Sequence, residues 1–369
     1  MFASQTSKYE NKMEKKADTK NQHYVPQFYQ RNFSINEKTI GVYLFAQNKY
    51  IPTAAIKHQA SADYYYSTNM KIEEALGALE KLAATAIDKI KQAPICKLAD
   101  KDAKALYVFT MIQISRTPAF VKMLTDNVNK MCTMMLRKYV EAVRKTDQAS
   151  EVEEITDEIL DCVSIDLKEP GRSAIGIMSQ AIDICSDMLY GAKLLINKTS
   201  KAFITSDNPA CMYDQHFERI GQLNYALGSS GLQIYLPLTP TLAIMYYDNC
   251  CYKIGSRKKH YVEIEQEKDV DQLNRLVACT ADEVIFCRDG DCSISELENY
   301  AKAHKKYHIT DPVQTFETKK NENSEIFGAT NVTMYCKMHL SFIKELPNYK
   351  AKTSTNFDYC KDRLRKSAY

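Results

Sequence analysis

Three residues that are far apart in the chain have side chains suited to acid–base chemistry or to binding a divalent cation. His23 lies in the dense stretch 21-NQHYVPQFYQRNF-33, Glu80 lies close to an apolar helical stripe, and Asp207 follows an apolar strand-like run. Imidazole nitrogens and carboxylate oxygens ligate metal ions and also serve as general acids and bases. If folding brings the three together, we expect His23, Glu80 and Asp207 to hold Mg²⁺ or Mn²⁺ and to be the catalytic groups.

Each of these residues also has a structural interpretation that involves no chemistry. A lone histidine is often a half-buried ring held by a backbone hydrogen bond. Glu80 could lie on a solvated helix face and form i,i+4 ion pairs. The run Thr-Ser-Asp-Asn-Pro at 205–209 is typical of a turn, which explains these residue types without a function. Both interpretations stay open at this point.

Other polar residues are placed where they could orient a substrate. Gln113 and Arg116 are three residues apart and therefore share one face of a helix. Arg116 directly precedes Thr117-Pro118, where that helix breaks, and an arginine at such a break can bind an anion or pair with a carboxylate such as Glu80. We expect the substrate to contact Tyr24, Gln113, Arg116 and Asn208.

The period of the apolar residues predicts the elements that position these side chains. Strands are predicted at 39–56 (a hairpin), 63–67, 194–213 (two strands around a turn at 198–200), 232–248 (two strands) and 283–289. Helices are predicted at 72–92, 99–116, 121–144, 173–193 and 267–281. This order predicts an α+β fold, with an N-terminal β-hairpin and a later antiparallel-rich sheet around a central helical bundle.

The chain divides into three parts by composition. Residues 1–20 are Lys-rich and are predicted to be a disordered tail, and residues 21–295 are predicted to form one domain. Residues 296–369 are a C-terminal extension of unknown role, predicted to be a short helix, an extended arm and a loose tail. Within the domain, the basic cluster 257-RKKH-260 is predicted to be an exposed turn that could contact phosphates.

Composition and missing motifs exclude several classes of protein. The net charge of +3 over 369 residues neither requires nor excludes nucleic acid. The 12 cysteines are scattered without a CxxC pair, which argues against clustered zinc ligands and against a secreted disulfide scaffold. No Walker A, GxGxxG, HExxH or GxSxG motif is present, so no nucleotide cofactor is expected. No segment has the length and apolarity of a membrane span or a signal peptide, and we expect a cytoplasmic protein.

The quoted motifs resemble those of a known family. HYVPQFY at 23–29, RNF at 31–33 and TSDNP at 205–209 resemble the signatures of the bacterial family of domain of unknown function 4238 (DUF4238). The agreement continues in order with IEEALGALE at 72–80, QISRTP at 113–118, PLTP at 237–240 and Asn274, and it covers roughly residues 21–290. The family often has an aliphatic residue where Gln30 stands here.

The resemblance implies a bacterial, cytoplasmic protein whose His23, Glu80, Arg116 and Asp207 share a pocket, but it implies no reaction. We expect a metal-dependent hydrolase acting on a phosphate-containing substrate, of the nuclease or phosphodiesterase type, with nucleic acid or a nucleotide as a candidate partner. The alternative is a non-enzymatic ligand- or partner-binding module. A third interpretation is a buried polar network that only locks the N-terminal segment onto the helices.

Overall fold

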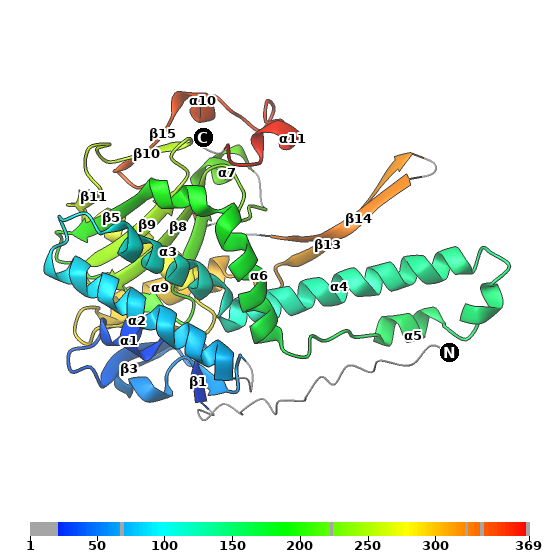
Figure 1. The fold of residues 1–369 in the computed structure, drawn as a ribbon, viewed down its shortest axis with the longest axis horizontal. Coiled ribbons are helices and arrows are strands. Elements are labelled where there is room, and N and C mark those ends of the chain that lie inside the picture. Colours follow the sequence, from blue (N-terminus) through cyan, green and yellow to red (C-terminus); the bar gives the residue numbers. More distant parts are fainter. Residues whose placement is uncertain (1–20, 67–69, 222–223, 322–323, 333–335, 367–369) are drawn as a thin grey trace, which may run out of the picture.

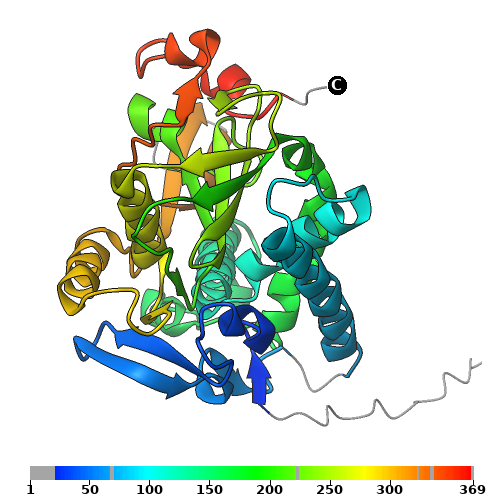
Figure 2. The ribbon, with the colours of Figure 1, turned by 90° about the vertical axis from the view of Figure 1, so that its left-hand side faces the viewer.

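The structure is a computed structural model that describes residues 21–66, 70–221, 224–321, 324–332 and 336–366. The predicted disordered tail at 1–20 lies outside these residues. The fold is α+β, as predicted. A five-stranded sheet lies between two layers of helices, and a separate four-stranded sheet carries the N-terminal hairpin (Figures 1 and 2).

The five-stranded sheet has the order β11-β5-β9-β8-β7, and its neighbours are antiparallel except for β11 and β5. In that order its strands are Tyr261–Ile264, Ala192–Asn197, Leu242–Tyr247, Leu232–Thr239 and Cys211–Asp214. β8 and β9 are buried along their whole length, as the unbroken apolar run requires of strands covered on both faces. The strand pair predicted at 232–248 is confirmed.

Alternate residues of β8 face different helical layers, because successive side chains of a strand point to opposite faces. Ile234 packs in the apolar cluster that contains Phe109 of α3. Tyr235 packs in the cluster that contains Leu273 of α8. The helices of the first layer are α2 (Met70–Gln92), α3 (Asp100–Ser115) and α6 (Pro170–Ile184), and those of the second are α8 (Glu267–Thr280) and α9 (Ile294–Tyr307).

Helices α2 and α3 are antiparallel, since Lys89 pairs with Asp102 and Glu80 pairs with Arg116. α3 ends at the predicted break, and α4 (Pro118–Val143) begins there with Pro118 in its first turn. α4 projects from the body together with α5 (Asp157–Cys162) (Figure 1). Within the described residues, every helix is too short or too polar to traverse a lipid bilayer.

The four-stranded sheet has the order β3-β2-β12-β6. Its strands are Lys49–Ala55, Thr39–Leu44, Val284–Cys287 and Thr205–Ser206. The predicted hairpin at 39–56 is therefore confirmed, and it joins a strand that follows α8. Strands are present on both sides of the turn predicted at 198–200, but β5 and β6 belong to different sheets. A strand's local pattern does not specify its distant partner, and here β6 pairs with β12.

The C-terminal extension is built onto the body rather than trailing from it. α9 packs against α8, and β15 (Ile343–Glu345) pairs with β10 (Tyr252–Ile254). β13 (Val313–Asn321) and β14 (Ser324–Asn331) form a hairpin beside α4, where an extended arm was predicted (Figure 1). The remaining short elements are β1 (Asn21–His23), α1 (Gln27–Arg31), β4 (Ser61–Asp63), α7 (Gln215–Ile220), α10 (Pro347–Lys350) and α11 (Tyr359–Asp362).

Candidate functional site

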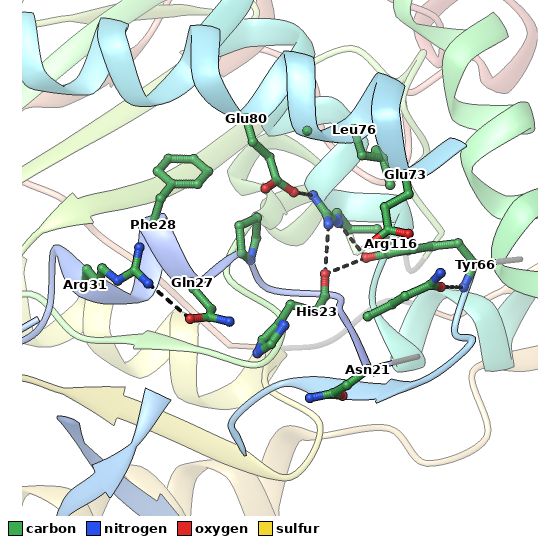
Figure 3. A pocket seen from close by; sticks show the side chains of 13 residues that line it. Asn21, His23, Gln27, Phe28, Arg31, Tyr66, Glu73, Leu76, Glu80 and Arg116 are labelled. Atoms are coloured by element: carbon green, nitrogen blue, oxygen red, sulfur yellow. Dashed lines mark hydrogen bonds and ion pairs between the residues drawn. The ribbon is translucent and has the colours of Figure 1, made fainter. Parts of the chain in front are cut away.

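Arg116 ties the N-terminal strand to the helical layer. Its side chain is 2% exposed, and it reaches three partners from the end of α3 (Figure 3). Nε donates to the hydroxyl of Tyr66 at 2.8 Å, and Nη2 donates to the carbonyl of His23 at 2.8 Å. Nη1 pairs with Oε1 of Glu80 at 2.8 Å. The guanidinium therefore closes a junction between β1, α2 and α3.

The main chain of Tyr24, the residue after His23, is also held by a side chain of α3. The side chain of Gln113 donates to the carbonyl of Tyr24 at 2.8 Å, and the amide of Tyr24 donates to the carbonyl of Ala60 at 2.9 Å. The ring of Tyr24 packs against Tyr65 with centroids 5.3 Å apart. Gln113 and Arg116 thus fix main-chain atoms of the motif, which a structural role would require.

A cavity of about 410 Å³ lies beside this junction, and we call it the N-terminal cavity. Figure 3 shows Arg31 and Gln27 on one side of it, Glu73 on the other, and Glu80 between them. Arg31 is exposed and donates to Gln27 at 3.1 Å. Of the predicted site residues, His23, Glu80 and Arg116 line the cavity, whereas Tyr24, Gln113, Asp207 and Asn208 do not.

The imidazole of His23 is half-buried at the edge of this cavity. Burial lowers its pKa, with the charge of Arg116 acting in the same direction and a backbone hydrogen bond at Lys57 opposing them. The ring is therefore largely neutral at pH 7. Its Nε2 is buried without a hydrogen-bond partner. A neutral imidazole of this kind can accept a proton or ligate a metal ion.

Asp207 has a different environment from His23 and Glu80. Its carboxylate is 2% exposed and accepts from the backbone amides of Asp282 at 2.9 Å, Glu283 at 2.6 Å and Val284 at 3.1 Å. Burial raises the pKa of Asp207 to about 7, although these amides act to lower it. The side chain therefore fixes the chain between α8 and β12.

Two neighbouring asparagines hold the same region. The side chain of Asn208 donates to the carbonyl of Thr280 at 3.0 Å, at the end of α8. Asn274 accepts from the amide of Ile204 at 3.1 Å and donates to the carbonyl of Ala202 at 2.8 Å. The Thr-Ser-Asp-Asn-Pro segment thus serves as a hydrogen-bonded turn against α8, which is the structural interpretation of that motif.

The structure does not bring His23, Glu80 and Asp207 into one coordination sphere. Among the described residues, the group of potential ligand atoms that lie within 4.8 Å of one another is a different one. The physical reason is that both oxygens of Asp207 are occupied by the amides of residues 282–284, while Glu80 is paired with Arg116. The proposed polar network therefore forms in two separate parts. Mg²⁺ or Mn²⁺ binding itself stays a prediction.

A second and larger cavity, of about 930 Å³, opens where the start of α3 faces the β10–β11 loop and the edge of the five-stranded sheet. We call it the basic groove. Its lining includes seven cationic side chains and one acidic side chain, Asp100. The cations are Lys97, Lys104, Lys193, Lys253, Arg257, Lys258 and Lys259.

The cations of the basic groove have no carboxylate partners within the described part of the chain. The ion pairs of the structure involve other residues, and six of the seven cations are exposed. Lys193 is the exception: it is buried, and it donates to the carbonyls of Ser256 at 2.9 Å and of Lys259. Burial lowers the pKa of Lys193. This lysine thereby ties the basic loop to β5.

An aromatic ring also faces the groove. Tyr190 lines it with 72% of its surface exposed, close to the end of α6. Such a ring offers a flat apolar face beside the cations. The sequence pattern identified the cluster at 257–260 but missed Lys97, Lys104 and Lys193. Their contribution arises only because the loop before α3 folds against the end of β10.

Comparison with known proteins gives one match. A family model described as "Protein of unknown function (DUF4238)" matches residues 21–291, well over half of the chain. No curated protein and no solved structure matches the chain significantly. The matched region contains the N-terminal cavity and the basic groove, and it ends before β13, β14 and β15.

Proposed function

We propose that this chain, which belongs to the DUF4238 family, binds single-stranded nucleic acid in the basic groove. One observation carries the proposal: the groove's exposed lysines and arginine have no carboxylate partners among the described residues. Cations held close together repel one another, and phosphate oxygens relieve that repulsion. The basic groove is therefore the part of the molecule best suited to a phosphate-rich ligand.

Single strands fit the groove better than a compact anion does. The six exposed cations come from two segments, 97–104 and 253–259, so they can follow a chain of successive phosphates. Proteins that bind single strands combine such a charged path with aromatic rings on which bases stack, and Tyr190 is placed for that role.

The test is a titration of a fluorescent single-stranded oligonucleotide with the full chain over a range of salt concentrations. For a single strand, the plot of log K against log salt becomes shallower by about 0.7 for each phosphate that the protein no longer neutralises. We expect the triple variant Arg257→Gln, Lys258→Gln, Lys259→Gln to bind more weakly and to have a shallower plot. The matched control removes three exposed lysines of α9, by Lys302→Gln, Lys305→Gln and Lys306→Gln. Equally weakened binding in both variants would refute a groove-specific site.

Hydrolysis of a phosphate-containing substrate is a second candidate function. It is favoured by His23 and Glu80 lining one cavity together, with the exposed guanidinium of Arg31 at its edge. The imidazole of His23 can act as a general base, while Arg31 would bind the phosphate. Cleavage of the oligonucleotide with Mg²⁺ or Mn²⁺, abolished in His23→Ala and retained in the groove variant at saturating substrate, would support it. No cleavage under any of these conditions would exclude it.

A cytoplasmic, bacterial origin is part of the same proposal. The eleven cysteines whose side chains are described are all free thiols. Free, mostly buried thiols are usual in a reducing compartment. Localisation by cell fractionation with an antibody against the native chain tests this directly.

A further inference from the structure

A third group of polar side chains is buried where the C-terminal extension joins the body. His216 lies on α7, Cys251 immediately precedes β10, and Glu345 ends β15. A ring nitrogen of His216, the thiol of Cys251 and a carboxylate oxygen of Glu345 lie within 4.8 Å of one another. α7, β10 and β15 meet at one end of the molecule (Figure 1).

Two buried polar atoms at this place have no hydrogen-bond partner. Nε2 of His216 has none, in a residue with no exposed surface. Oδ2 of Asp214 has none either, in a residue that is 1% exposed, while its Oδ1 accepts from the amide of Phe217 at 2.9 Å. A buried polar atom without a partner is unfavourable, so two of them in residues that are two positions apart in the chain require an explanation.

Nε2 of His216 stays without a hydrogen-bond partner in every protonation state of the ring. Nδ1 lies 2.9 Å from Oε1 of Glu345, which accepts, and 3.3 Å from Nη2 of Arg219, which only donates. Whichever contact Nδ1 makes, Nε2 stays without a partner. Hydrogen bonds within the chain therefore leave this cluster incomplete.

We propose that His216, Cys251 and Glu345 bind one zinc-class divalent ion that fastens the C-terminal extension to the body. A thiolate, an imidazole nitrogen and a carboxylate oxygen together are a ligand set for zinc. His216 and Cys251 are buried and Glu345 is partly buried, which is typical of an ion with a structural role rather than of a catalytic centre.

Arg219 supports the arrangement from outside. Its Nε donates to Oε2 of Glu345 at 2.7 Å and its Nη2 donates to Oε1 at 3.3 Å, and Oε1 also lies 2.9 Å from Nδ1 of His216. An outer partner of this kind orients a ligating carboxylate. The alternative is that Arg219, Glu345 and His216 form a buried ion-pair network without a metal ion. That alternative predicts no metal-dependent signal.

The site also differs from what cysteine spacing indicates. The scattered cysteines argued against clustered zinc ligands, but here the ligands come from three segments that the fold brings together. The family model ends at residue 291, so Glu345 lies outside it. The ion would therefore belong to the junction between the matched region and this chain's own extension.

The test titrates chelator-treated full-length protein with Co²⁺, which reports thiolate and tetrahedral ligation by its absorption. We expect one equivalent to bind, with a sulfur-to-cobalt charge-transfer band, and excess Zn²⁺ to abolish that band. Cys251→Ser should lose the band, whereas Cys250→Ser, which removes the adjacent and partly exposed thiol, should keep it. Absence of the band in folded wild type, or its persistence in Cys251→Ser, would overturn the proposal.

Thermal unfolding gives a readout that does not depend on cobalt. Zn²⁺ should raise the melting temperature of wild type and of Cys250→Ser but not that of Cys251→Ser. If Cys251→Ser does not fold, Glu345→Gln replaces it, and the same loss is expected. Arg219→Ala should weaken Co²⁺ binding by about 10–100-fold while keeping the band. An unchanged melting temperature of wild type with Zn²⁺ would favour the metal-free network and refute the site.

Discussion

The N-terminal cavity and the basic groove use charged side chains in opposite ways. Beside the cavity, the guanidinium of Arg116 is buried and has three partners within the chain, one of them the carboxylate of Glu80. In the groove, six exposed cations have no carboxylate partner among the described residues. The family motif beside the cavity is thus easier to recognise in the sequence than the groove is, yet most of its polar groups form hydrogen bonds and ion pairs that stabilise the fold. The groove is less conspicuous, and its charge remains available to a ligand.

Removal of Arg116 should have the largest effect on stability. Arg116→Met removes the donor to the hydroxyl of Tyr66 and to the carboxylate of Glu80, and it leaves the carbonyl of His23 with only the hydroxyl of Tyr66 as donor. Breaking a buried ion pair by removing one partner lowers the free energy of unfolding by about 3–5 kcal/mol. Urea denaturation of the variant and of wild type measures this difference in unfolding free energy. The variant Glu80→Gln, which retains a hydrogen-bond acceptor, should lose less, and an Arg116→Met protein as stable as wild type would show that the junction is not structural.

The pH dependence of stability should reveal the buried carboxyl group of Asp207. Its pKa is about 7 in the folded state and about 3.9 when unfolded, so the folded protein binds more protons between these values. The contribution of Asp207 to the free energy of unfolding is fully present below about pH 4. It is lost as the pH rises to about 7, and the loss amounts to up to about 4 kcal/mol. Relative to Asp207→Asn, wild type should therefore lose stability across that range. A relative gain with rising pH would mean that the three amides keep the carboxyl group ionised.

A smaller effect is expected for the neighbouring asparagine. Asn208→Ala removes the hydrogen bond to the carbonyl of Thr280 and leaves that carbonyl at the end of α8 without this donor. The expected loss of unfolding free energy is about 1 kcal/mol, the usual value for one such bond. The same denaturation experiment measures it. A loss as large as that of Arg116→Met would mean that the turn does more than cap α8.

The groove variant should have the smallest effect on stability. Arg257→Gln, Lys258→Gln and Lys259→Gln remove exposed charges that have no carboxylate partner, so the free energy of unfolding should stay within about 0.5 kcal/mol of wild type. Relief of mutual repulsion could even raise it slightly. If the triple variant is strongly destabilised, the contrast between the two regions fails, because the groove's charge would then be structural as well.

The sequence predicts helices and strands that have a strong local periodicity. It does not predict which residues far apart in the chain contact one another. Helices α2, α3 and α8 and the hairpin of β2 and β3 are present as predicted, and the pairing of Glu80 with Arg116 follows from an antiparallel helix pair. The direction of the Asp207 side chain could not be predicted, since its partners lie about seventy-five residues away. The hairpin of β13 and β14 was missed because an exposed hairpin needs no alternation of apolar residues.

The hydrogen bonds around β1 also determine which part of the chain can fold first during synthesis. The partners described for the carbonyls of His23 and Tyr24 are supplied by residues up to Arg116. The hydrogen-bond partners described for the side chains of Asp207 and Asn208 lie between residues 280 and 284. A ribosome synthesises the first set before it reaches α4, and the second set only about 165 residues later. We expect the N-terminal junction to close early in translation, and the turn at Asp207 to wait for the strand that completes it.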